Sequence, residues 1–123
     1  IPVSRGENTR VELRSPDPTA NPYLAIAVAL MAGLDGIKNK IEPPAHMDEN
    51  ALSMTEKERE EACIKTLPDT LMAAIEAFRE DPFMKEVLGE QVYNTYLEEK
   101  LNEWNEYRAV VTDWEVSKYL YRY

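Results

Sequence analysis

Three charged side chains at alternate positions, Arg10, Glu12 and Arg14, have the types and spacing best suited to chemistry in this chain. The residues between them, Val11 and Leu13, are apolar, and this alternation predicts a strand with all three charges on one face. Neighbours on one face of a strand stand roughly 6–7 Å apart. Two guanidinium groups would bind phosphate or carboxylate oxygens, and the carboxylate between them is a hard ligand for Mg²⁺. The same pattern also fits a solvent-facing strand whose charges pair with one another.

The sequence pattern around these residues predicts an α+β fold, in which an N-terminal β-hairpin is followed by a mostly α-helical remainder. The hairpin would consist of Ile1–Val3 and Thr9–Arg14, as two strands of a larger sheet. The expected division is a strand hairpin and loop at 1–18, a buried helix region at 19–42, a linker at 43–54 and a helical part at 55–123. Residues 1–44 carry five basic and five acidic residues, so the net charge of −9 falls on the residues that follow.

Capping residues predict where the helices begin. Asn21 and Pro22 suit the first positions of a helix, and the stretch Tyr23–Leu34 that follows has no polar face. A helix that is apolar on every side must be buried, which here requires more protein than 123 residues supply. Further helices are expected to begin at Thr55–Glu58, Leu67-Pro68, Asp81-Pro82, near Gln91 and at Thr112–Glu115, with a break near Gly89.

Composition excludes several classes of function. Acidic residues outnumber basic ones 23 to 14, which argues against direct nucleic-acid binding and against an anionic membrane surface. The only cysteine, Cys63, cannot form an internal disulfide, so we expect a cytoplasmic protein. The only histidine, His46, follows two prolines with no second ligand nearby, so a surface position is expected. Because the chain opens on Ile1, we expect a fragment of a longer protein.

Four segments of the first third form a distinctive set of motifs: Ile1–Arg5, Thr9–Pro18, Ala20–Leu24 and Ala32–Ile41. Together they resemble the C-terminal part of the catalytic domain of bacterial type I glutamine synthetase. A looser likeness continues through Leu67-Pro68 and Trp114-Glu115. The resemblance implies an enzyme that forms L-glutamine from L-glutamate, ammonia and ATP through γ-glutamyl phosphate. It also implies two divalent cations per subunit, Mg²⁺ or Mn²⁺.

The resemblance further implies a role for four residues. Glu12 aligns with a ligand of the metal that lies against the ATP phosphates, and Arg10 with an arginine that contacts those phosphates. Arg14 aligns with a catalytic arginine that binds the glutamate side-chain carboxylate or the phosphoryl group arriving on it. Arg5 lies in a loop near the nucleotide and is predicted to bind ATP.

The same family assembles as two stacked hexamers with active sites shared between neighbouring subunits. The resemblance therefore implies a homo-oligomer, a dodecamer, with a transcriptional regulator as a further partner to consider. We expect the 123-residue chain alone to be inactive, because the family's other metal ligands lie upstream. The alternative is a non-catalytic helical oligomerisation or interaction module, which would need neither the Arg-Glu-Arg pattern nor an all-apolar helix.

Overall fold

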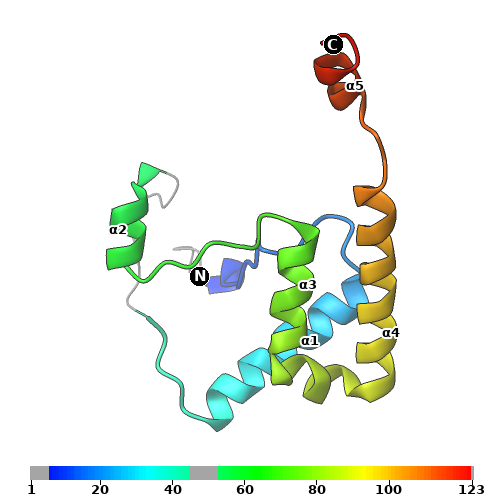
Figure 1. Ribbon diagram of the computed structural model, residues 1–123. Helices are drawn as coiled ribbons and strands as arrows, with labels where there is room; N and C mark the ends of the chain where they lie inside the picture. Colours follow the sequence, from blue (N-terminus) through cyan, green and yellow to red (C-terminus); the bar gives the residue numbers. More distant parts are fainter. Residues whose placement is uncertain (1–5, 45–52, 123) are drawn as a thin grey trace. The chain divides into compact units, whose positions relative to one another are not determined.

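The computed structural model describes residues 6–44 and 53–122 of the chain (Figure 1). It divides into two compact units, Ile1–Leu67 and Pro68–Tyr123. The first unit contains a short 3-10 helix, η1 (Gly6–Asn8), and the helices α1 (Pro22–Lys38) and α2 (Glu56–Glu61). The second contains α3 (Leu71–Glu80), α4 (Pro82–Arg108) and α5 (Asp113–Tyr119).

The predicted N-terminal β-hairpin is wrong, and with it the α+β class. Throughout residues 6–44 and 53–122 the regular elements are helices, and Thr9–Arg14 forms no strand. Ile1–Val3, the other predicted strand, lies outside the described residues. A strand is defined by its ladder of hydrogen bonds to a neighbouring strand, and a two-stranded hairpin by itself is marginally stable at best. The alternation of charged and apolar residues correctly predicts that the two kinds of side chain lie on opposite faces. It does not specify a neighbouring strand whose backbone could form hydrogen bonds with this segment.

Helix α1 begins where the sequence predicts. The Asn21 side-chain oxygen accepts hydrogen bonds from the backbone N–H groups of Tyr23 and Leu24, at 3.0 and 3.4 Å. Pro22 occupies the first turn, where its missing N–H costs no hydrogen bond. At the other end, α1 finishes at Lys38, four residues beyond the predicted apolar stretch. The N–H of Ile41 donates to the carbonyl of Gly36 at 2.9 Å and closes this end of the helix.

The surface of α1 is apolar and, within the described part of the chain, mostly exposed. None of its residues is buried, and Tyr23 and Ile37 are 84% and 77% exposed. Exposing a helix of this composition to water is unfavourable by roughly 25 cal/mol for each Å² of apolar surface. The buried helix region expected at 19–42 is therefore not buried within the described residues, and its cover by further protein stays a prediction. Across the described residues, no helix combines the length and apolar character that crossing a bilayer requires.

The helix starts predicted at Thr55–Glu58 and Thr112–Glu115 are confirmed at α2 and α5, and each is a capping box. The hydroxyl oxygen of Thr55 accepts a hydrogen bond from the backbone N–H of Glu58 at 3.3 Å, and the Glu58 carboxylate accepts one from the Thr55 N–H at 2.7 Å. Thr112 and Glu115 repeat this reciprocal arrangement at 3.2 and 2.8 Å. Each box satisfies two N–H groups that lack partners within the helix.

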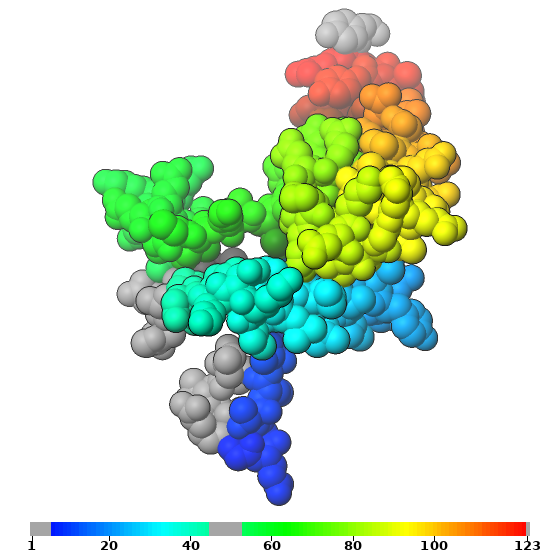
Figure 2. Space-filling model, turned by 90° about the horizontal axis from the view of Figure 1, so that it is seen from below, coloured from blue at the N-terminus to red at the C-terminus, as the bar shows by residue number. Residues whose placement is uncertain are grey.

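The second unit is organised around the packing of α3 against α4. In the space-filling view, the atoms of α3 and of the first turns of α4 form one continuous body (Figure 2). Its buried centre contains Ile75, which is 3% exposed, and Tyr93, which is 8% exposed. The Tyr93 ring stacks on Phe78 with 5.0 Å between centroids, and its hydroxyl donates to the carbonyl of Arg79 at 3.2 Å.

The start of α3 and the break inside α4 were both predicted from the sequence. The helix α3 begins at Leu71, a few residues after the predicted start at Leu67-Pro68. Thr70 caps it, because its hydroxyl oxygen accepts a hydrogen bond from the N–H of Ala73 at 3.1 Å. The predicted break near Gly89 is confirmed, since Gly89 has a φ of 74° and a ψ of 159° inside α4. Only glycine adopts that conformation readily, so the break depends on this residue.

Candidate functional site

The extended segment Thr9–Arg14 is held by a turn at each end. Before it, η1 closes through a hydrogen bond from the N–H of Thr9 to the carbonyl of Gly6 at 3.0 Å. After it, the Asp17 carboxylate accepts from the N–H of Thr19 at 2.7 Å, which makes a side-chain turn ahead of α1. Both turns that flank the segment are therefore formed by hydrogen bonds between residues close to it in the sequence.

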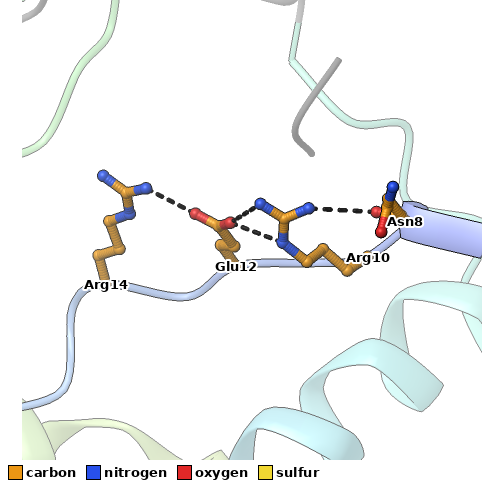
Figure 3. A network of polar contacts seen from close by, with 4 residues as sticks. All are labelled: Asn8, Arg10, Glu12 and Arg14. Carbon is orange, nitrogen blue, oxygen red and sulfur yellow. Dashed lines mark hydrogen bonds and ion pairs between the residues drawn. The ribbon is translucent and has the colours of Figure 1, made fainter. Parts of the chain in front are cut away.

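Within this segment, the structure brings Arg10, Glu12 and Arg14 together (Figure 3). One carboxylate oxygen of Glu12 accepts a hydrogen bond from Nε of Arg10 at 2.8 Å and forms an ion pair with Nη2 of the same arginine at 2.6 Å. The other accepts from Nη2 of Arg14 at 2.6 Å. The sequence prediction of one carboxylate between two guanidinium groups is met in the geometry, although the segment is not a strand.

Electrostatics keep this carboxylate charged. Hydrogen bonds from Arg14, first, and from Arg10 hold the pKa of Glu12 below its ordinary value, because both favour the ionised form. The Glu12 side chain is 29% exposed, whereas that of Arg14 is 87% exposed. Glu12 is therefore anionic at neutral pH, and Arg14 presents most of its guanidinium to solvent.

The carboxylate of Glu12 offers the kind of oxygen that Mg²⁺ or Mn²⁺ accepts, but one residue is not a metal site. Mg²⁺ demands near-octahedral coordination, and Ca²⁺-like sites need still more oxygens. Among the described residues there is no group of three or more histidine, cysteine, aspartate or glutamate side chains able to hold an ion. A single carboxylate, whose two oxygens already contact Arg10 and Arg14, does not form such a site by itself.

Other residues considered from the sequence stand apart from this cluster. Arg5 and His46 lie outside the described residues. Cys63 is exposed and follows α2. Sequence reasoning missed Asn8, whose backbone carbonyl accepts from Nη1 of Arg10 at 3.2 Å. A backbone acceptor leaves no residue-type signal in the sequence.

Comparison with known proteins settles the family. The family described as "Glutamine synthetase, catalytic domain" matches residues 1–119. The chain belongs to the glutamine synthetase family. It is 49% identical over 123 residues to a glutamine synthetase of Clostridium saccharobutylicum, an alignment that covers 100% of this chain and 28% of the relative.

Two further glutamine synthetases are equally similar. The one from Methanosarcina mazei is 52% identical over 120 residues, covering 98% of this chain and 27% of its own length. The one from Thermus thermophilus is 50% identical over 123 residues, covering 100% of this chain and 28% of its own. The chain thus spans little more than a quarter of the length of these glutamine synthetases, and the resemblance seen in the sequence is confirmed.

Proposed function

We propose that the full-length protein is a glutamine synthetase, an ATP-dependent ligase that forms L-glutamine from L-glutamate and ammonia. In this reaction, the side-chain carboxylate of glutamate attacks the terminal phosphorus of ATP and ADP departs. Ammonia then attacks the γ-glutamyl phosphate and releases inorganic phosphate. The observation that carries the proposal is the Arg10–Glu12–Arg14 cluster inside a chain that matches the glutamine synthetase catalytic domain.

Each residue of the cluster has a role that suits its chemistry. Arg10 would bind ATP phosphate oxygens, because a guanidinium is a planar set of donors that matches them. Arg14, which is the more exposed arginine, would bind the glutamate side-chain carboxylate and then the phosphoryl group on it. Arg5 is proposed as a further ATP-binding residue.

Glu12 has two roles in this proposal. Its two oxygens hold the arginines apart at fixed places, and it would supply one carboxylate ligand to a divalent cation, Mg²⁺ or Mn²⁺. Two such cations are proposed per subunit, and their chemistry is to neutralise phosphate charge during transfer. Catalysis of phosphoryl transfer is mostly positioning and charge stabilisation, which is what this cluster of residues can provide.

We further propose that the protein is a cytoplasmic homo-oligomer, a dodecamer of two stacked hexamers. Support comes from the exposed apolar side chains at the C-terminal end, among them Trp114 at the start of α5 and Leu120 and Tyr121 after it. Exposed aromatic residues of this kind commonly anchor subunit interfaces. Contact with a transcriptional regulator is a finer proposal, which only the resemblance suggests.

The test is a glutamine-forming assay on the purified full-length protein. We expect glutamine and ADP to form in equal amounts, and neither to form when ATP, ammonia, glutamate or the divalent cation is left out. The alternative, a non-catalytic interaction module, predicts no glutamine under any of these conditions. An ATPase activity that does not depend on glutamate would also contradict the proposal.

A further inference from the structure

We infer that Glu12 competes with the substrate for Arg14: before substrate binds, its carboxylate occupies the guanidinium group that is proposed to bind glutamate. The inference rests on the proposed function, because it takes the ligand of Arg14 from there. The side chain of free glutamate ends in the same carboxylate as the side chain of Glu12, so both suit the same donors. Glu12 is therefore an autoinhibitory contact inside the Arg10–Glu12–Arg14 cluster.

Of the two arginines, Arg14 is the one that can change its partner more easily. Its contact with the cluster is made by one nitrogen, Nη2, which donates to one oxygen of Glu12 at 2.6 Å. Arg10 contacts the other oxygen of Glu12 through both Nε and Nη2, and its Nη1 donates to the backbone carbonyl of Asn8 (Figure 3). The Arg14 side chain is also 87% exposed, against 53% for Arg10. An incoming carboxylate can therefore reach Arg14 while Arg10 keeps its contacts.

The position of the contact on the guanidinium group decides what an incoming carboxylate meets. A guanidinium binds a carboxylate with two nitrogens, either Nε and Nη2 or Nη1 and Nη2, and Nη2 belongs to both pairs. Glu12 contacts Arg14 at Nη2. A carboxylate that takes the same hydrogen of Nη2 must displace Glu12, and one that takes the other pair lies beside Glu12 and is repelled by its like charge. Both arrangements weaken the binding of an anion to Arg14.

The test is calorimetric titration of the full-length protein with L-glutamate, in EDTA so that no divalent cation contacts Glu12. Glu12→Gln keeps the size of the side chain but removes its charge and its charge-assisted hydrogen bonds. We expect this variant to bind glutamate about twofold to fivefold more tightly than the wild type, the factor that one exposed ion pair supplies. Glu12→Asp keeps the charge but shortens the side chain by one carbon, so it should show part of the same gain.

Glu7→Gln is the matched control, because it removes the same charge from the neighbouring η1 and should leave the affinity for glutamate unchanged. An equal gain in Glu7→Gln and Glu12→Gln would overturn the inference, since net charge alone would then explain it. Binding by both Glu12 variants that is no tighter than in the wild type, including no detectable binding in any of them, would overturn it too. If the wild type nevertheless forms glutamine in the assay with all substrates and the cation, the proposed function stands and only this inference fails.

Discussion

At the scale of single residues, the difference between Arg14 and a lysine gives the most direct test of the cluster. Arg14→Lys keeps the positive charge, but an ammonium group cannot span two oxygens as a planar guanidinium does. We expect kcat/KM of the full-length enzyme to fall by about 10²–10³, the usual cost of losing one well-placed transition-state contact. Arg108→Lys, in the last turn of α4, is the matched control and should keep normal activity. Near-normal turnover by Arg14→Lys would remove Arg14 from the site.

The carboxylate of Glu12 gives a second prediction at this scale. Glu12→Gln keeps the shape of the side chain but removes the charge that attracts a divalent cation. The cation concentration for half-maximal activity should therefore rise, while the melting temperature of the full-length protein changes little. Glu7→Gln, an acidic residue in η1, serves as the control and should leave the cation response unchanged.

A particular outcome would assign Glu12 a different role. A large fall in melting temperature with an unchanged response to Mg²⁺ would make Glu12 a structural partner of the two arginines and not a metal ligand. The two ion pairs by themselves should add little to the free energy of unfolding, because both arginines are more than half exposed.

The scale of elements shows why local features were predictable from the sequence and the hairpin was not. The caps at Asn21, Thr55 and Thr112 depend on side chains that bond to N–H groups two or three residues away. The strand at Thr9–Arg14 depended on a neighbouring strand, which no pattern inside the segment specifies. Prediction of the charged cluster succeeded because side chains at i and i+2 share a face in any extended backbone, paired or not.

The packing of α3 on α4 gives a prediction about stability. Ile75 is buried at the centre of this pair, so Ile75→Ala removes apolar contacts and leaves a cavity. We expect the free energy of unfolding of the 123-residue chain to fall by about 2–5 kcal/mol, measured by chemical denaturation followed by circular dichroism. Ile26→Ala makes the same change on exposed α1 and should cost less than about 1 kcal/mol. Equal effects of the two substitutions would mean that α3 and α4 do not form the stable core of this chain.

At the scale of the whole molecule, the described residues contain one charged cluster and no complete metal site. The Arg10–Glu12–Arg14 cluster consists of one carboxylate and two guanidinium groups. The chain spans about 28% of the length of its relative from Clostridium saccharobutylicum. Glutamate, ATP and two cations need more ligands than this cluster offers, since binding must offset the entropy of immobilising each of them.

We therefore expect the purified 123-residue chain to form no glutamine and to bind ATP no more tightly than roughly millimolar. The exposed apolar surface of α1 should also make the isolated chain self-associate, because apolar patches of this kind rarely remain exposed to water in soluble monomers. Isothermal titration with ATP and sedimentation velocity over a range of protein concentrations would measure both properties. Ile26→Asp together with Ile37→Asp places charge on α1 and should shift the chain toward monomer. Glutamine synthesis by the isolated chain, free of host enzyme, would show that the Arg10–Glu12–Arg14 cluster lies in a more complete site than proposed here.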